Sequence, residues 1–262
     1  MAERTLSKNS LLAEWLNRCL VRNRQPHGHA RRILSFNGQV IGSVDPLLWP
    51  LVAPHWPPAK SLDKCLDSLA QALQASGRCG VWRNEFVAVR NAEGNGVGRI
   101  ERGAARVLGV ATEAVHLVGF APDGRVWIQQ RALDKANDPG LWDTLVGGMV
   151  ANGETLHDTM VRETREEAGL PVHELQNLKW GTPFLMTRPT DDGGGLGQLV
   201  ETVHWCVATV PAHLRPENLD GEVAGFECLD ANAVARRVLD GACTDEAALV
   251  LARALGWPLS PA

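Results

Sequence analysis

The amino-acid sequence predicts a two-domain α+β protein, and three observations support this class. Strand-like and helix-like segments are mixed along the 262 residues without the regular βαβ order of a doubly wound sheet. Apolar patterns typical of β-strands predominate from about residue 108 onward. A Gly-rich polar segment at 91–98 precedes that change and is typical of a hinge or linker. We therefore expect a small α+β accessory domain over residues 1–107 and a larger domain over residues 108–262.

Local signals predict the elements of the accessory domain. Apolar residues from Leu12 to Leu20 recur at helical spacing, and a second set from Leu62 to Leu73 marks another amphipathic helix. The pair Asn37-Gly38 lies between two apolar runs. This pair favours the positive φ angles of a two-residue turn, so it predicts a β-hairpin.

The larger domain is expected to open with a second hairpin, because apolar runs at 115–120 and 126–128 flank a Pro-Asp-Gly turn. A helix should then run from about Thr155 to Ala168. Thr155 and Asp158 resemble a capping box at its start, and Gly169 is a favoured stop at its end.

The remainder of the chain predicts a loop, a strand and a last helix. Residues 191–197 are Gly-rich and read as a flexible loop, and residues 200–210 follow as a strand. Thr244 is suited to cap a final helix that ends near Leu255, where Gly256 and Pro258 stop it.

Composition excludes several classes of protein. The chain is 45% hydrophobic and 21% charged, as is usual for folded soluble proteins. It contains no run of roughly 18 uninterrupted apolar residues, and its N-terminus lacks the apolar core of a secretory signal. We therefore expect a cytoplasmic protein with no membrane partner. A net charge of -4 argues against a nucleic-acid partner, and the cysteines lack the spacing of a zinc site.

Three carboxylates are expected to share one face of the helix at 155–168. Glu163, Glu166 and Glu167 are offset by zero, three and four residues, and at ~100° per residue they fall within an arc of roughly 100°. Their mutual repulsion favours a cation, and Mg²⁺ prefers oxygen ligands of this kind. An isolated ExxEE pattern is more often a solvated acidic face, so the surrounding residues must decide.

Those surrounding residues form a longer pattern. Residues 148–170 resemble the Nudix box, GX5EX7REUXEEXGU, in which U is a bulky aliphatic residue. Thr164 is the one departure, because an aliphatic side chain is expected there to pack under the helix. The resemblance implies a Nudix α/β/α sandwich with a mixed sheet. The matching residues are Gly148, Glu154, Arg162, Glu163, Glu166, Glu167, Gly169 and Leu170.

The resemblance also implies roles for the box residues. Glu166 and Glu167 are the expected direct metal ligands, joined by the backbone carbonyl of Gly148 or of its neighbour Gly147. Glu163 is expected as a further ligand or as the base that activates water. The implied cofactor is Mg²⁺, with Mn²⁺ as the alternative ion, and the implied chemistry is attack of water on phosphorus.

Two further residues complete the catalytic candidates. Arg162 is expected to pair with Glu154 and so to orient the helix carboxylates. Glu222, in an Asp-Gly-Glu-Val sequence, is a candidate to reach the metal cluster from a different element. A turn-flanking surface residue is the alternative interpretation of Glu222.

The substrate candidates lie upstream of the box. Arg131 and Lys135 are candidates to bind the diphosphate, one by a fork of donors and the other as a point charge. A solvated strand end is the alternative for both. Trp142 is a candidate to stack on a substrate ring, with core packing as its alternative.

Motifs outside the box narrow the resemblance to the Nudix proteins related to thiamine pyrophosphokinase. Members of that group hydrolyse thiamine diphosphate, and preferentially its oxidised, damaged forms, to the monophosphates. The implied function is therefore removal of a damaged cofactor. The residues that carry this resemblance are 36–42, 82–85, 100–102, 126–135, 139–143 and 216–226.

Other functions stay open at this point. A Nudix hydrolase of ADP-ribose, NADH or a nucleotide is the nearest alternative. An isopentenyl diphosphate isomerase shares the fold but needs a catalytic Cys, and residues 114–150 contain none. A non-catalytic ligand-sensing Nudix domain is disfavoured by the intact box. A homodimer is a further expectation.

Overall fold

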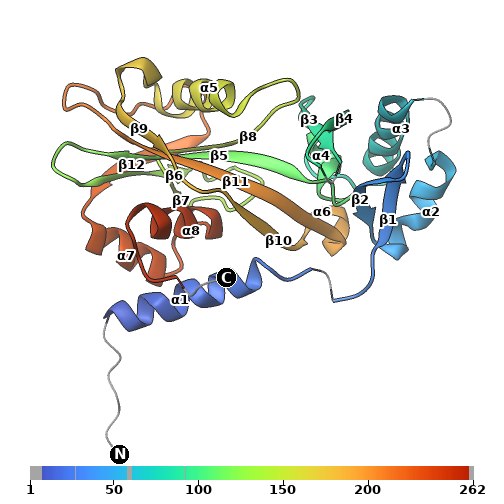
Figure 1. Cartoon of the computed structure of the whole chain (residues 1–262), viewed down its shortest axis with the longest axis horizontal. Coiled ribbons are helices and arrows are strands. Elements are labelled where there is room, and N and C mark those ends of the chain that lie inside the picture. Colours follow the sequence, from blue (N-terminus) through green and yellow to red (C-terminus); the bar gives the residue numbers. More distant parts are fainter. Residues whose placement is uncertain (1–7, 27, 58–60, 92, 260–262) are drawn as a thin grey trace, which may run out of the picture.

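The computed structural model describes residues 8–26, 28–57, 61–91 and 93–259. Residues 1–7, which begin the segment inspected for a secretory signal, lie outside the described residues. Figure 1 shows a larger, strand-rich body and a group of smaller elements at one end of it. No helix in this part of the chain is both long enough and apolar enough to cross a membrane.

A mixed eight-stranded sheet forms the centre of the larger body. β5 and β11 pair in parallel and the other pairs are antiparallel. β5 is buried along almost its whole length, as its near-continuous apolar sequence requires. The main path runs β10 (Phe184–Thr190), β11 (Gly197–Thr209), β5 (Thr112–Phe120), β6 (Val126–Arg131) and β12 (Val223–Leu229), and β7 (Trp142–Asp143), β8 (Val146–Met149) and β9 (Gln176–Trp180) pair with β6, β5 and β11.

Helices cover both faces of this sheet (Figure 1). α5 (Leu156–Ala168), followed by the 3₁₀ turn η3 (Val172–Glu174), lies on one face, and α7 (Ala231–Leu239) and α8 (Asp245–Ala254) lie on the other. Met160 of α5 shares a core with Leu117 of β5, whereas Leu249 of α8 shares another with Val203 of β11. The expected Nudix sandwich with a mixed sheet is confirmed.

The smaller elements enclose a separate apolar core, so the expected accessory α+β part is present. Leu69 of its longest helix and Ile100 of its last strand are completely buried there. The predicted hairpin is confirmed, with Asn37 and Gly38 at φ 50 and 79. The elements are β1 (Arg32–Phe36), β2 (Gln39–Val44), η1 (Pro46–Leu48), α2 (Trp49–Val52), η2 (Ala53–His55), α3 (Leu62–Ala75), β3 (Phe86–Arg90), β4 (Gly96–Glu101) and α4 (Arg102–Ala105).

One of the two Gly-rich segments is more regular than its composition predicted. The segment at 91–98 is not a linker, because it forms the tight connection between β3 and β4. Asn91 Oδ1 accepts the backbone N–H of Asn95 at 2.8 Å there. The segment at 191–197 contains the four-residue turn α6 (Asp192–Gly195), in which Gly193 and Gly194 have the non-helical φ values 68 and 76. This part of the segment remains close to the predicted loop. Small polar residues serve tight turns as readily as linkers, which is why the prediction of a linker was wrong.

The first helix, α1 (Lys8–Arg22), packs on the larger body. Leu16 and Cys19 are completely buried in the core that α7 and α8 share. At the end of the helix, Arg22 Nε donates to Asp245 Oδ2 at 2.7 Å, and Asn23 Nδ2 donates to the same oxygen at 2.6 Å. The domain boundary at residue 107 stays a prediction. Although α1 precedes that boundary, it completes the core of the larger body.

The contact between α1 and α8 predicts a pH-dependent stability. Burial would raise the pKa of the Asp245 carboxyl, but hydrogen bonds from Arg22 and Asn23 outweigh it and keep the pKa below its ordinary 3.8. The stabilisation is therefore present above that value and is lost as the pH falls below it. We expect Asp245→Asn to lower the free energy of unfolding by about 1–2 kcal/mol at neutral pH, with the difference shrinking below pH 3.8 in urea titrations.

Glu14→Gln is the matched control for this prediction, because Glu14 pairs with Arg18 on the exposed face of the same helix. An exposed pair contributes little, so the control should change the free energy of unfolding by less than about 0.5 kcal/mol. Equal losses in the two variants would contradict a special contribution from Asp245.

Candidate active site

Local residues fix both ends of α5, the helix that carries the box carboxylates. Thr155 Oγ1 accepts the N–H of Asp158 at 3.1 Å, and Asp158 Oδ2 accepts the N–H of Thr155 at 3.0 Å. The predicted capping box is therefore confirmed. Gly169 ends the helix at φ 62, a conformation that costs little without a Cβ. These two caps fix where the helix begins and ends, and thereby where its carboxylates lie along the helix axis.

Arg162 holds three carboxylates of the box. Its Nε and Nη2 donate to the two oxygens of Glu154 at 2.7 and 2.9 Å. Its Nη1 donates to Glu163 Oε1 at 2.8 Å and to Glu166 Oε2 at 3.1 Å. A bidentate guanidinium–carboxylate pair gives geometry as well as attraction. The structure thus brings Arg162 and Glu154 together as the sequence predicted and places two of the three clustered carboxylates on the same guanidinium.

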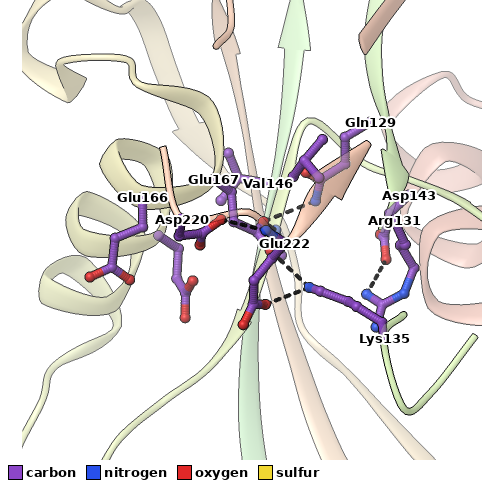
Figure 2. A network of polar contacts seen from close by, with 12 residues as sticks. Gln129, Arg131, Lys135, Asp143, Val146, Glu166, Glu167, Asp220 and Glu222 are labelled. Atoms are coloured by element: carbon purple, nitrogen blue, oxygen red, sulfur yellow. Dashed lines mark hydrogen bonds and ion pairs between the residues drawn. The ribbon is translucent and has the colours of Figure 1, made fainter. Parts of the chain in front are cut away.

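Glu167 is the buried member of the cluster, with 1% of its surface exposed. Its Oε2 accepts from Gln129 Nε2 at 2.9 Å and from the N–H of Gly147 at 3.0 Å. Its Oε1 lies 3.5 Å from Lys135 Nζ, which also lies 2.5 Å from Glu222 Oε2. Figure 2 shows Lys135 reaching between the two carboxylates. Glu222 therefore meets the cluster through Lys135.

The electrostatics of the site follow from burial and crowding. Burial and the neighbouring Glu167 charge raise the pKa of Glu163 to about 8, against the opposing effect of Arg162. Burial also raises the pKa of Glu167, although Lys135 and a backbone N–H oppose the rise. Burial would raise the pKa of Glu222 too, but the hydrogen bond from Lys135 outweighs it and lowers that pKa. Burial and neighbouring carboxylates thus make Glu163 and Glu167 reluctant to ionise in the absence of a compensating cation.

A divalent cation would relieve this crowding of carboxylates. A Cβ built on Gly148 would lie 2.1 Å from Glu163 Oε1, so the Glu163 carboxylate rests directly against that backbone. Across the described residues, no three acidic, His or Cys side chains are already gathered in a metal-binding arrangement, and Arg162 and Lys135 hold the carboxylates instead. Carboxylate and backbone carbonyl oxygens are nevertheless the donors that Mg²⁺ and Mn²⁺ prefer.

Thr164 shows how the box tolerates its one departure from the pattern. The side chain is completely buried, and its Oγ1 donates to the carbonyl oxygen of Met160 at 2.6 Å. The hydroxyl is thereby satisfied within the helix, so a polar side chain under α5 leaves no unpaired group.

A cavity of about 350 Å³ opens beside these carboxylates. The predicted residues Arg131 and Lys135 line it together with the box residues. Residues from the segment before β3, from β3 and from α4, which the sequence did not place at the site, line it as well. The lining residues are Arg83, Glu85, Phe86, Val87, Arg102, Arg131, Lys135, Ala136, Asn137, Gly147, Gly148, Met149, Ala151, Arg162, Glu163, Glu166, Asp220 and Glu222.

Trp142 is the substrate candidate that the structure does not bring into this cavity. It is 7% exposed in the apolar core, and the Arg237 guanidinium lies 4.4 Å from the centre of its ring. Its neighbour Asp143 is instead the polar residue near the site, with Oδ2 at 3.4 Å from Arg131 Nη1. Asp143 and Gln129 are site residues that the sequence did not reveal. Half of β6 is polar, and no local signal distinguishes Gln129 from Gln130 beside it.

The fold and this arrangement of carboxylates and cations together define a Nudix protein. The family model described as NUDIX domain matches residues 111–247, which is more than half of the chain. The chain therefore belongs to the Nudix family.

Known proteins resemble parts of the chain. An isopentenyl-diphosphate Delta-isomerase of Leifsonia xyli is 35% identical over 115 residues, which are 44% of this chain and 60% of that protein. Nudix hydrolase 20, a chloroplastic protein of Arabidopsis thaliana, is 38% identical over 151 residues, 52% of this chain and 36% of that protein. The crystal structure of DR0079 from Deinococcus radiodurans matches with a TM-score of 0.50 and 26% identity, covering 64% of this chain and 99% of that one. The chain thus spans less than two thirds of these two curated relatives.

The contact between Gly148 and Glu163 predicts the effect of one added methyl group. We expect Gly148→Ala to push the Glu163 carboxylate away from the backbone and to weaken Mn²⁺ binding by about 10-fold or more. Isothermal titration calorimetry of the full chain measures this affinity. Gly225→Ala is the matched control, because a Cβ there meets nothing within 4 Å. Unchanged Mn²⁺ affinity in a folded Gly148→Ala protein would contradict an ion site formed by the Gly148 backbone and the Glu163 carboxylate.

Proposed function

We propose that the chain is a Mg²⁺-dependent hydrolase that cleaves the diphosphate link of a small organic diphosphate. The observation that carries this proposal is the meeting of two opposite sets of charge around one cavity. Glu163 and Glu166 line it as ligands for a cation, and Arg131 and Lys135 line it as ligands for phosphate. Diphosphate hydrolysis needs both sets, because a metal and basic side chains share the neutralisation of phosphate charge.

The residues proposed to hold the ion are Glu163, Glu166, Glu167 and the carbonyl of Gly148. When bound, Mg²⁺ would neutralise diphosphate charge and make a water easier to deprotonate. Gln129 fixes Oε2 of Glu167 at 2.9 Å, which leaves Oε1 directed towards Lys135. These contacts hold the carboxylates in place before the substrate arrives, and such preorganisation is a main source of rate acceleration.

As the alternative to holding the ion, Glu163 is proposed as the general base. A carboxylate that accepts a proton readily suits this role, and burial raises the pKa of Glu163 to about 8. A base works best when its pKa lies near the operating pH. A bound cation opposes the rise, because it favours the ionised form. Glu163 would accept the proton of the attacking water at its carboxylate, while Arg162 keeps that carboxylate oriented through the bond at 2.8 Å.

Lys135 is the proposed diphosphate ligand, and Glu222 is the residue that positions it. Lys135 Nζ lies 2.5 Å from Glu222 Oε2, and the Lys135 side chain is 12% exposed. An ammonium held at the cavity wall is a point charge that binds phosphate without fixing its orientation. Arg131, whose guanidinium lies against Asp143 and the carbonyl of Asn137, would add a planar fork of donors.

Thiamine diphosphate and its oxidised forms are the substrates we propose, with the monophosphates as products. The support comes from the resemblance of the motifs at 82–85 and 100–102 to the thiamine pyrophosphokinase-related Nudix proteins. Residues from both motifs, Arg83, Glu85 and Arg102, line the same cavity as the box carboxylates.

Isomerisation of an isopentenyl diphosphate is the second candidate, because a relative that is 35% identical bears that name. The cavity argues against it. None of the residues that line it in the described chain is a cysteine, and residues 114–150 contain none. The nucleophile or acid that the isomerase resemblance requires is therefore missing from its expected place.

Glu167→Gln tests the metal-ligand assignment. We expect turnover with Mg²⁺ to fall by at least about 100-fold, because the neutral amide cannot replace a buried carboxylate ligand. The fold should persist, because removing one of several repelling charges relieves crowding. Steady-state kinetics measure the first effect and urea unfolding the second. Glu217→Gln, at an exposed position, is the control that should keep full activity. Full activity of Glu167→Gln would refute the assignment.

A panel of substrates tests the specificity. The full chain with Mg²⁺ would be given thiamine diphosphate, its oxo form, ADP-ribose and NADH, and the products would be separated by chromatography. We expect the oxidised thiamine compound to be hydrolysed fastest, to its monophosphate. If a nucleotide were the preferred substrate, the proposed diphosphate hydrolysis would still be supported, but the assignment of thiamine diphosphate as substrate would be contradicted.

A further inference from the structure

We propose that the accessory domain supplies a phosphate subsite to the active site. Arg83 and Arg102 bind the terminal phosphate of the substrate and thereby favour diphosphates with a free terminal phosphate over diphosphates esterified at both ends. This inference deepens the proposed function and rests on it.

The accessory elements are attached directly to the start of the Nudix box. Phe86 O of β3 accepts the N–H of Asn152 at 2.7 Å, and Val87 forms a β-bridge with Ala151. Arg102 Nε lies 3.1 Å from Met149 Sδ, at the end of β8. We call the part of the cavity lining formed by Arg83, Glu85, Phe86, Val87 and Arg102 the accessory wall. It lies at a fixed position beside Gly148, and its side chains line the same cavity as the box carboxylates.

A buried carboxylate brings the two arginines to the same end of the accessory domain. Glu101 is 1% exposed, and its Oε1 accepts the N–H of Arg83 at 2.9 Å and that of Gly103 at 3.5 Å. Gly80 N–H donates to the carbonyl of Gly103 at 2.8 Å and ties the same two segments together. One buried side chain thus fixes the backbone beside both cations.

Arg83 differs from the other cations of the cavity in how loosely it is paired. Lys135 and Arg162 each have a carboxylate oxygen within 2.8 Å, and Arg102 has Glu85 at 2.6 Å. Arg131 donates to the carbonyl oxygen of Asn137 at 3.0 Å and lies 3.4 Å from Asp143 Oδ2. The carboxylate recorded for the Arg83 guanidinium in the described chain is that of Glu222, at 3.9 Å, which is beyond hydrogen-bond length. Its donors remain available for an anion, and its side chain is 30% exposed.

A hollow beside α5 offers apolar side chains to the organic part of the substrate, which would orient it. This hollow shares Arg162, Glu166 and Asp220 with the cavity and contains no accessory residue. Val161 and Leu219 line it with 39% and 60% of their surface exposed. An organic group bound in this hollow would leave the diphosphate across the carboxylates, with its terminal phosphate towards Arg83 and Arg102.

The charge of the terminal phosphate makes this subsite selective. A free terminal phosphate carries about −1.5 to −2 charges at pH 7 and three strong acceptor oxygens. Esterification removes one of these charges and one of the oxygens. An esterified phosphate still offers two oxygens to one guanidinium. The free phosphate gains from its additional charge and from a third oxygen that the second guanidinium can bind.

ADP and ADP-ribose form a matched pair of substrates for the test, because they share adenosine diphosphate and differ in esterification of the terminal phosphate. We expect Arg83→Ala to lower kcat/KM for ADP and for thiamine diphosphate by about 10- to 100-fold. The value for ADP-ribose should change by less than about 3-fold. Arg83→Lys, which retains the charge without the fork, should recover part of the loss.

Arg32→Ala is the control within the accessory domain, because Arg32 lies over the Trp49 ring outside the cavity. It should leave both substrates unaffected. Equal losses on ADP and ADP-ribose in Arg83→Ala would overturn the assignment to the terminal phosphate, and so would unchanged kinetics on both.

A binding measurement separates this inference from the proposed function. If the unmodified chain hydrolyses no diphosphate, the proposed function fails, and the subsite is then tested by calorimetric titration with inorganic pyrophosphate in EDTA. A loss of affinity of about 10-fold in Arg83→Ala, but not in Arg32→Ala, would support the subsite. Equal affinities, or no binding by the unmodified chain, would overturn it.

Discussion

Repulsion among the carboxylates of α5 is the constraint on which the rest of the active site depends. Glu163 and Glu167 are both largely withdrawn from water, so their charges cannot be screened by solvent. Arg162, Lys135 and the amide of Gln129 each compensate part of that charge from a different element. These groups reach the carboxylates from α5 itself, from the segment after β6 and from β6.

Short-range signals in the sequence predicted the structure well, and long-range contacts escaped it. The capping box of α5 and the Asn37-Gly38 turn depend on residues within four positions of one another. Gln129, in contrast, reaches Glu167 across 38 positions, and no local pattern encodes that meeting. The Gly-rich segment at 91–98 was misassigned as a linker because a tight turn and a linker use the same small residues. The role of the accessory wall was likewise invisible without the fold.

The site also shows why chemistry is easier to infer from sequence than specificity. The three carboxylates proposed to hold the ion lie on one helix at fixed spacing, so the box alone predicts that they meet. The substrate-facing groups come from separate segments, among them Arg83, Lys135 and Asp220, and their convergence is a property of the tertiary structure. A Nudix domain can therefore keep its carboxylates while a neighbouring domain changes what the cavity accepts.

The position of α1 has a consequence for the order of folding during synthesis. Its partner Asp245 lies 223 residues after Arg22. At the usual ribosomal rate of 5–20 residues per second, about 10–45 s pass between the appearance of the helix and that of its docking site. During that interval the apolar side of α1, with Leu16 and Cys19, has no native partner from α7 or α8. The elements from β1 to α4 enclose a core of their own and are synthesised before α8, so they can fold before α1 docks.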